Sequence, residues 1–161
     1  MIAVRPAQAA DAPQIAALLN AIIAAGGTTA METPLKEAGL AKRIVATPDR
    51  SCWHVAQDGT GRLVGVQWAE PHPGLPADMA DIATFTRIGM TGCGIGTALF
   101  QATQAACRAR GYRALNAAIR AENIGGLRFY ESLGFTDWQV AHDARLASGK
   151  VTGKWFKRID L

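Results

Sequence analysis

Four glycines in the stretch "GMTGCGIGTALF", at positions 89, 92, 94 and 96, stand directly before an apolar run that is typical of a helix. The first N–H groups of a helix have no partner within it, and the peptide dipoles add a partial positive charge at that end. Glycine also lets a ligand approach the backbone closely, so this arrangement favours binding of an anion, usually a phosphate. A tight turn would be the better explanation for a glycine pair, but four glycines in eight positions favour the phosphate site.

The composition excludes several other classes of protein. Hydrophobic residues make up 49% and charged residues 19% of the chain, as in a globular protein, and no apolar run is long enough for a membrane span. The N-terminal segment lacks the pattern of a signal peptide, so we expect a cytoplasmic protein. The three histidines are scattered and the cysteines form no C-x-x-C pair, so we expect reduced thiols, no disulfide framework and no metal.

The net charge of +4 does not form a nucleic-acid footprint. A nucleic-acid-binding protein concentrates basic residues in a patch or stripe. Here the cluster is confined to Lys154, Lys157 and Arg158 near the C-terminus, which we interpret as a solvated strand face. We therefore expect neither a nucleic acid nor a membrane as partner.

The glycine loop must be positioned by the elements around it. Hydrophobic periodicity predicts a strand before the loop at 81–89, a helix after it from Ile95 to Arg110, a strand at 112–119 and a helix at 123–134. Before these we expect a strand at 2–7, a helix from Asp11 to Gly26, a short helix starting at Thr33–Pro34, and a hairpin of 51–57 and 62–70 in which His54 points outward. Two strands, 135–140 and 153–161, end the chain.

This order of elements predicts the fold class. We expect a single α/β domain over residues 1–161, with a mixed, mostly antiparallel central sheet and helices on both faces.

Two other phosphate-binding loops fit less well. The dinucleotide fingerprint is G-x-G-x-x-G with an acidic residue about 20 positions later, whereas here Thr97 stands at the third glycine position and no acid follows. The nucleotide P-loop needs a lysine after its last glycine, and none is present.

The loop "TGCGIGTALF" resembles the pyrophosphate-binding loop R/Q-x-x-G-x-G/A of the GNAT family of N-acetyltransferases. The segment "NIGGLRFYESLGF", which begins at Asn123, resembles that family's second motif, with Asn123, Tyr130, Gly134 and Phe135 in register. Within the family, the chain looks most like the phosphinothricin and methionine-sulfoximine acetyltransferases. The resemblance is strong over residues 80–135.

The resemblance implies that acetyl-CoA is the co-substrate and which residues bind it. They are the loop residues, the strand segment that pairs with the pantetheine arm, and two residues of the second motif: Thr91, Gly92, Cys93, Gly94, Ile95, Gly96, Thr97, Thr84, Phe85, Thr86, Asn123 and Tyr130. One departure is Thr91, where the family usually has Arg or Gln. Arg87 or Arg128 could supply the lost charge, and Cys93 fits as a small filler.

Transfer of an acetyl group from a thioester to an amine needs an acid for the departing thiolate and a base for the amine. A phenol is protonated at neutral pH, and the family uses a tyrosine at the motif position of Tyr130 as this acid. For the base, the phosphinothricin-type relatives carry a glutamate that aligns with Asp81. Glu70 is the rival and Glu32 the third choice.

The acceptor is expected between the first helix and the hairpin. Asn20, Thr28, Thr29, Glu32 and Trp68 fall in these regions, and small polar groups beside a tryptophan suit an amino-acid-like or other small amine. A protein N-terminus or a lysine stays open as acceptor. Relatives are often dimers, so the resemblance also implies a homodimer. The rival functions are an acyl-CoA-binding module without turnover and a dinucleotide-dependent oxidoreductase.

Overall fold

The computed structural model describes residues 1–161 and contains one seven-stranded sheet. The strands run in the order β1-β2-β3-β4-β5-β7-β6. Their bounds are β1 Ala3–Pro6, β2 Cys52–Gln57, β3 Leu63–Glu70, β4 Met79–Thr86, β5 Ala114–Arg120, β6 Thr136–Arg145 and β7 Val151–Asp160. Only β4 and β5 pair in parallel. The expected mixed, mostly antiparallel sheet is confirmed, and it differs from the parallel sheet of a dinucleotide-binding fold.

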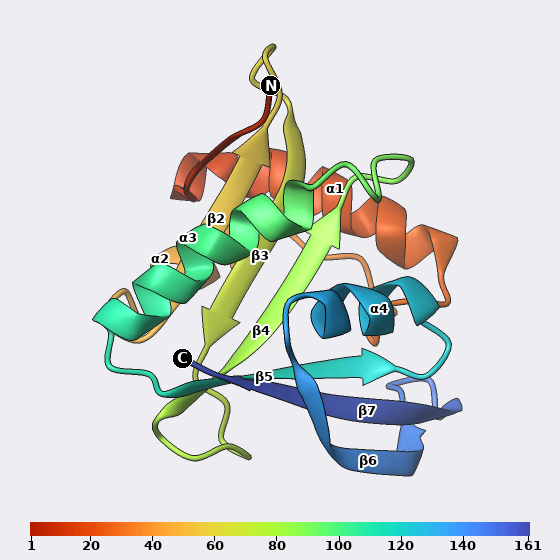
Figure 1. The fold of residues 1–161 in the computed structure, drawn as a ribbon. Helices are drawn as coiled ribbons and strands as arrows, with labels where there is room; N and C mark the ends of the chain where they lie inside the picture. Colours follow the sequence, from red (N-terminus) through yellow and green to blue (C-terminus); the bar gives the residue numbers. More distant parts are fainter.

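Four α-helices cover the two faces of this sheet (Figure 1). Helices α1 (Ala12–Ala25) and α2 (Glu37–Val45) lie on one face, where α1 buries an apolar stripe against Val55 and Val66. Helices α3 (Ile95–Ala109) and α4 (Ile124–Ser132) lie on the other face, and a 3-10 turn, η1 (Ala9–Asp11), precedes α1. Helices thus cover both faces of the sheet, as predicted, and the central strands β2 and β3 are buried on both sides.

Strands β4 and β5 separate in the middle of the sheet. Their pairing runs from Met79 opposite Ala114 to Ile82 opposite Ala117 and then ends, although both strands continue. Figure 1 shows β4 and β5 leaving their common origin in different directions, with α4 beside the opening. The edge of β4 beyond Ile82 thus has no strand partner on the β5 side, and its backbone groups are available to a ligand.

His54 does not point outward as predicted. It is 7% exposed, and its Nδ1 lies 3.3 Å from Oγ1 of Thr103 on α3. The expectation of a solvated face was wrong because β2 lies between β1 and β3 and is covered by helices on both faces, so neither face of this strand reaches solvent.

Three further details differ from the sequence-based expectations. Helix α2 begins at Glu37, not at Thr33–Pro34, because residues 26–36 form an irregular loop held to α1. Strand β6 extends to Arg145, beyond the predicted end at position 140. Lys157 is buried, with its ammonium group donating to Glu131 at 3.0 Å and paired with Asp137, so the predicted basic strand face is not fully solvated.

No helix has both the length and the apolar character needed to cross a lipid bilayer.

Candidate active site

The glycine loop approaches α3 with its backbone donors free. Gly92 and Gly94 have φ of +79° and +77°, a conformation that residues with a side chain rarely adopt, and Gly94 is the N-cap residue of α3. The first helical bond is donated by the Ala98 N–H to the Gly94 carbonyl, and no N–H of residues 91–97 donates to a backbone carbonyl. These N–H groups and the helix dipole make the loop suitable for a pyrophosphate.

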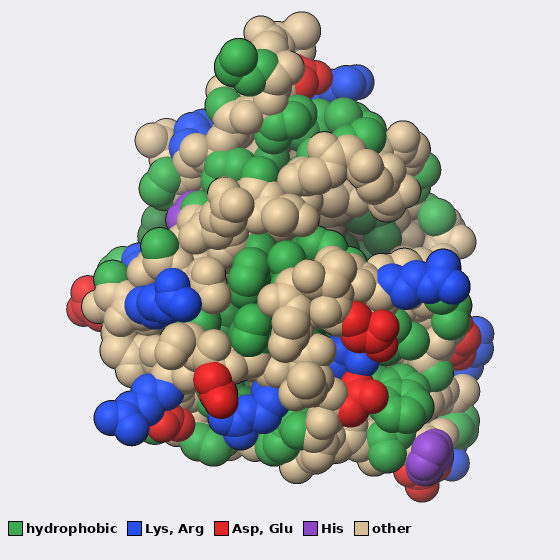
Figure 2. Space-filling view, viewed as in Figure 1, with side chains coloured by type: hydrophobic (Ala, Val, Ile, Leu, Met, Phe, Trp, Pro, Cys, Tyr) green, Lys and Arg blue, Asp and Glu red, His purple; other side chains and the backbone are tan.

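The glycines of the loop serve two different needs. A Cβ built at Gly92 or Gly94 meets no atom within 4 Å, so the space beside these residues is open to a ligand. A Cβ at Gly96 would lie 2.7 Å from the ring of Phe129 on α4, so Gly96 is required by helix packing. Figure 2 shows the surface hollowed between the loop and α4, with hydrophobic side chains on the floor of the hollow.

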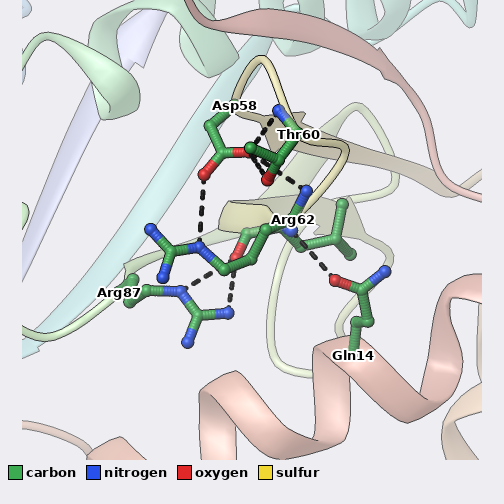
Figure 3. Close-up of polar contacts among 6 residues, drawn as sticks. Gln14, Asp58, Thr60, Arg62 and Arg87 are labelled. Atoms are coloured by element: carbon green, nitrogen blue, oxygen red, sulfur yellow. Dashed lines mark hydrogen bonds and ion pairs between the residues drawn. The ribbon is translucent and has the colours of Figure 1, made fainter.

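One of the two basic residues that could supply the charge missing at Thr91 is engaged elsewhere. Thr91 and Cys93 are exposed on the loop. Arg87, one of the two candidates for the lost charge, points to the β2–β3 hairpin, where its Nε and Nη2 donate to the Leu63 carbonyl at 3.0 and 2.6 Å (Figure 3). Arg128 is exposed on α4. The free backbone N–H groups are therefore the main donors of the loop.

Asn123 caps helix α4. Its Oδ1 accepts a hydrogen bond from the Gly126 N–H at 2.9 Å, which satisfies one of the unpaired donors at the start of the helix. The cap uses the oxygen and leaves the Asn123 Nδ2 group for a ligand. It also fixes the start of the helix that carries Tyr130 about two turns later.

Tyr130 reaches from α4 to the opening between β4 and β5. The side chain is 6% exposed, packed against Phe129 and Phe135, and its Oη lies 2.8 Å from Oγ1 of Thr84. Thr84 belongs to the part of β4 that has left β5. Burial raises the pKa of Tyr130 above its usual value of 10, so the phenol is protonated at neutral pH.

Thr84 has a second polar partner on the neighbouring strand. Gln67 of β3 stands opposite Thr84 in the antiparallel register, and its Nε2 donates to the Thr84 Oγ1 at 2.8 Å. Gln67 is fully buried, and its Oε1 has no hydrogen-bond partner. A row of three polar side chains thus crosses the α3–α4 face of the sheet.

Asp81 lies on the opposite face of β4. Successive side chains of a strand point to alternate faces, so Asp81 shares the α1–α2 face with Phe85, while Thr84 shares the other with Tyr130. Desolvation raises the pKa of Asp81, and this outweighs the hydrogen bond from Asn116 that lowers it. A carboxylate with a raised pKa is a better proton acceptor.

Asn116 and Trp138 hold the Asp81 carboxylate. The Asn116 Nδ2 donates to Asp81 Oδ1 at 2.8 Å, and the Asn116 Oδ1 accepts from the Trp138 Nε1 at 2.9 Å. Because the indole nitrogen can only donate, it fixes which end of the Asn116 amide faces Asp81.

Glu70, the rival base, stands opposite Asp81 in the β3–β4 register. Its carboxylate is paired with Arg43 of α2, whose Nε donates at 3.1 Å. The Arg43 guanidinium also lies over the rings of Trp53 and Trp68, at 5.2 and 5.0 Å from their centroids. This pairing neutralises Glu70 and leaves Asp81 as the carboxylate without a cationic partner at hydrogen-bond distance.

The predicted acceptor residues lie in the core, on helix α1 and in the 26–36 loop. Trp68 is buried in a stack between Trp53 and Phe85. Asn20 holds the 26–36 loop by exchanging two hydrogen bonds with the backbone of Leu35. Thr28 is exposed at the start of this loop.

The same loop is fastened to the β6–β7 turn and to β5. Glu32 accepts a hydrogen bond from the Ser148 N–H at 2.7 Å, which lowers the pKa of Glu32 and makes it a weaker base than an ordinary glutamate. The Thr29 carbonyl accepts from Nη1 of the buried Arg120 at 3.0 Å. These contacts bring the 26–36 loop over the end of β5.

Sequence reasoning missed the supporting residues Gln67, Asn116, Trp138, Arg43 and Arg120. Each is a polar or aromatic residue inside an ordinary strand or helix pattern, and none belongs to a motif. Buried polar residues at strand positions were the available signal, because such groups need partners. No group of three His, Cys, Asp or Glu side chains is placed to hold a metal ion.

Comparisons with known proteins identify the family and the fold. A model of the acetyltransferase (GNAT) family matches residues 17–135. The crystal structure of a GNAT superfamily phosphinothricin acetyltransferase from Sinorhizobium meliloti, in complex with acetyl-CoA, is similar with a TM-score of 0.89 and 25% identity, covering 99% of this chain and 88% of that one. A putative acetyltransferase from Salmonella typhimurium, also with acetyl-CoA, shares the fold at a TM-score of 0.90 and 17% identity, covering 100% and 94% of the two chains.

One curated relative is similar over part of its length. The mycothiol acetyltransferase of Thermobispora bispora is 34% identical over 84 residues, which cover 50% of this chain and 28% of the relative. The chain thus matches little more than a quarter of that protein. The family match extends over most of the sequence and includes both the glycine loop and Tyr130, so this chain belongs to the GNAT family of acetyltransferases.

Proposed function

We propose that this protein is an acetyl-CoA-dependent N-acetyltransferase that acetylates a primary amine of a small, amino-acid-like or other amine by direct attack on the thioester. One observation carries the proposal. A buried phenol and a half-buried carboxylate, Tyr130 and Asp81, flank from opposite faces the point where β4 leaves β5, and the glycine loop lies beside it. The charge of Asp81 raises the pKa of Tyr130, as expected of two groups at one site.

Acetyl-CoA, the acetyl donor, is held mainly by backbone groups. The free N–H groups of residues 91–97 bind the pyrophosphate, and the unpaired edge of Thr84–Thr86 pairs with the pantetheine arm. Asn123 contributes its Nδ2 to the same arm. When bound, acetyl-CoA supplies an acyl carbon with a thiolate leaving group.

Asp81 prepares the acceptor. A typical ammonium group has a pKa of about 10, so the amine must lose a proton before it attacks. The raised pKa of Asp81 favours uptake of this proton, directly or through one water, because an aspartate side chain is short. Backbone N–H groups of β4 beyond Ile82 stabilise the negative charge that develops on the acyl oxygen.

Tyr130 completes the transfer. It gives its proton to the sulfur as the carbon–sulfur bond breaks with its electron pair on sulfur. Asp81 first passes the ammonium proton to solvent, and the free amine nitrogen then forms the new bond to the acyl carbon. The second proton that this nitrogen loses also passes through Asp81 to solvent, and the tyrosinate regains a proton from solvent. The acid and the base therefore act from different faces of β4 without exchanging protons with each other.

The acceptor is proposed on the α1–α2 face. Asp81 gives this face a carboxylate without a cationic partner at hydrogen-bond distance, on the same side of β4 as the Phe85 ring, and the 26–36 loop borders the face. Negative charge beside aromatic rings suits an amine cation. A cytoplasmic location completes the proposal. The family resemblance also implies a homodimer, and light scattering measures the oligomeric state.

The proposal is tested by release of free thiol from acetyl-CoA in the presence of a panel of amines. The panel contains single amino acids, aliphatic amines and a short peptide with a free N-terminus. Amine-dependent thiol release, with an N-acetylated product seen by mass spectrometry, is the expected result. Binding of acetyl-CoA without thiol release for any amine would instead support an acyl-CoA-binding module.

A further inference from the structure

The geometry points to Gln67 and Thr84 as positioning residues that direct the hydroxyl hydrogen of Tyr130 toward the opening between β4 and β5. This inference rests on the proposed function for its kinetic consequences. Its structural content, the direction of one hydrogen bond, stands independently of turnover.

The direction follows from counting donors. The Thr84 hydroxyl has one hydrogen and two polar partners, Gln67 Nε2 and Tyr130 Oη, both at 2.8 Å. An amide nitrogen can only donate, so Gln67 uses an acceptor site of the Thr84 oxygen. Tyr130 could donate to the second acceptor site of the Thr84 oxygen, but the Thr84 hydrogen would then have no acceptor among these two partners. The Tyr130 oxygen is the one acceptor that these partners offer to the Thr84 hydrogen. Tyr130 then accepts from Thr84, and its own hydrogen is free for a ligand.

The orientation of the Gln67 amide supports the same direction. As placed, the buried amide leaves its carbonyl oxygen without a partner. With the amide turned over, the two N–H bonds would lack an acceptor at that position. Buried N–H groups without partners are rarer than buried carbonyls without partners, so the observed orientation is the more stable one.

The row of hydrogen bonds also matches the needs of a general acid. When Tyr130 loses its proton, the phenolate keeps a donor in the Thr84 hydroxyl, which is itself polarised by Gln67. The Thr84 hydrogen bond lowers the pKa of Tyr130 against the larger effect of burial. Without it, transfer to a thiolate whose thiol has a pKa of about 8.5 would be more unfavourable.

The test uses the fact that the chain has two tyrosines, Tyr112 and Tyr130. In a Tyr112→Phe background, the ultraviolet resonance Raman doublet of tyrosine reports on Tyr130 alone, in the protein without ligand. The intensity ratio of this doublet is high when the phenol oxygen accepts a hydrogen bond and low when the hydroxyl donates one. We expect a high ratio that falls in Thr84→Val and is restored in Thr84→Ser. A low ratio with Thr84 in place would overturn the inference.

Kinetics give the second readout. Thr84→Val should lower kcat at least about tenfold, the effect of losing one hydrogen bond to a developing charge, with the KM for acetyl-CoA little changed. Thr84→Ser should recover most of this loss, and Thr84→Val should cost nothing further in a Tyr130→Phe background. If the two substitutions lowered kcat independently of each other, Thr84 would not act through Tyr130, and the inference would be contradicted.

A matched control makes the same change elsewhere. Thr103 is a fully buried threonine on α3 that contacts His54 outside the site. Thr103→Val should leave the Raman doublet and kcat unchanged. If Tyr130→Phe itself has no effect on kcat, the proposed role of Tyr130 fails, while the Raman result still decides the direction of the hydrogen bond.

Discussion

The two faces of β4 differ in how the proposed proton-transfer groups, Tyr130 and Asp81, are supported. On the α3–α4 face, Tyr130 is buried among apolar rings and is reached by a row of neutral donors from Gln67 and Thr84. On the α1–α2 face, Asp81 stands opposite a second carboxylate, Glu70, and is held by Asn116. The first environment keeps a proton on oxygen, whereas the second raises the affinity of a carboxylate for one.

This difference shows how one strand can serve an acid and a base together. Because side chains alternate along a strand, neighbouring positions of β4 deliver groups to opposite faces. A thioester lying at the edge of β4 would then meet the phenol on one side and the amine with its base on the other. Mutations on either face should therefore have separate kinetic signatures.

The largest effect is expected from Gly94→Val. This substitution should prevent the binding of acetyl-CoA, on which the proposed roles of both faces of β4 depend. The φ of +77° strains any residue with a side chain, and the added atoms would project into the open space beside the loop. We expect no measurable binding of acetyl-CoA by calorimetry. Gly61→Val is the control, because Gly61 has a φ of +84° in the β2–β3 turn away from the site, and it should retain binding. Loss of binding in both variants would mean that the loss is a general effect of strain.

Tyr130→Phe tests the acid face. Removing the hydroxyl should lower kcat by about a hundredfold while the Kd for acetyl-CoA changes little, since ring packing is kept. Tyr112→Phe, which removes the hydroxyl that donates to the Arg50 carbonyl, should leave kcat unchanged. Parallel losses of kcat and of acetyl-CoA affinity in Tyr130→Phe would show that the residue is structural.

Asp81→Asn tests the base face through the pH profile. A base must be ionised to act, so kcat/KM should fall as pH is lowered through the pKa of Asp81, and this fall should lie at higher pH than for an ordinary aspartate because that pKa is raised. In Asp81→Asn the activity should drop by about a hundredfold and this limb of the profile should disappear. An unchanged limb would move the role of base to another group.

The same variant should be less active but more stable. A carboxyl group whose pKa is raised by folding destabilises the folded state above that pKa and has no such cost below its unfolded value. Asp81→Asn should therefore unfold at a higher temperature than the parent protein at neutral pH, and the difference should shrink as pH falls through the raised pKa. A less stable variant at neutral pH would show that the Asp81 carboxylate stabilises the fold.

The smallest effect is expected from Trp138→Phe, which tests how far the hydrogen bonds behind Asp81 set its pKa. Without the indole N–H, the Asn116 amide is no longer fixed, and its hydrogen bond to Asp81 weakens. That hydrogen bond lowers the pKa of Asp81, so the acid limb should move to higher pH while kcat at alkaline pH changes only a few-fold. A uniform loss at all pH values would indicate a packing defect instead.

The acid face was largely predictable from the sequence, because its main parts are local. The glycine loop leads directly into α3, and Asn123 and Tyr130 lie in one short helical segment. Strand alternation and the separation of β4 from β5 then follow from the fold class. The exception is Gln67, which lies in an apolar strand pattern and gains its role only when β3 and β4 are in register.

The base face could not be predicted to the same depth. Trp138 comes from the edge strand β6, and Arg43 from α2, so their contacts depend on tertiary packing that no short pattern encodes. The prediction for His54 failed for a related reason, because alternation along β2 does not reveal that helices cover both of its faces. The conformation of the 26–36 loop depends on Asn20 and Arg120, far apart in sequence.

The most direct test of the account is an isothermal titration of the purified protein with acetyl-CoA, with NAD as the comparison ligand. The account predicts one site with micromolar affinity for acetyl-CoA, a Kd that corresponds to about −8 kcal/mol, and no binding of NAD. Absence of acetyl-CoA binding would show that the loop with Thr91 does not hold the pyrophosphate, and the proposed acetyltransferase activity would be contradicted with it.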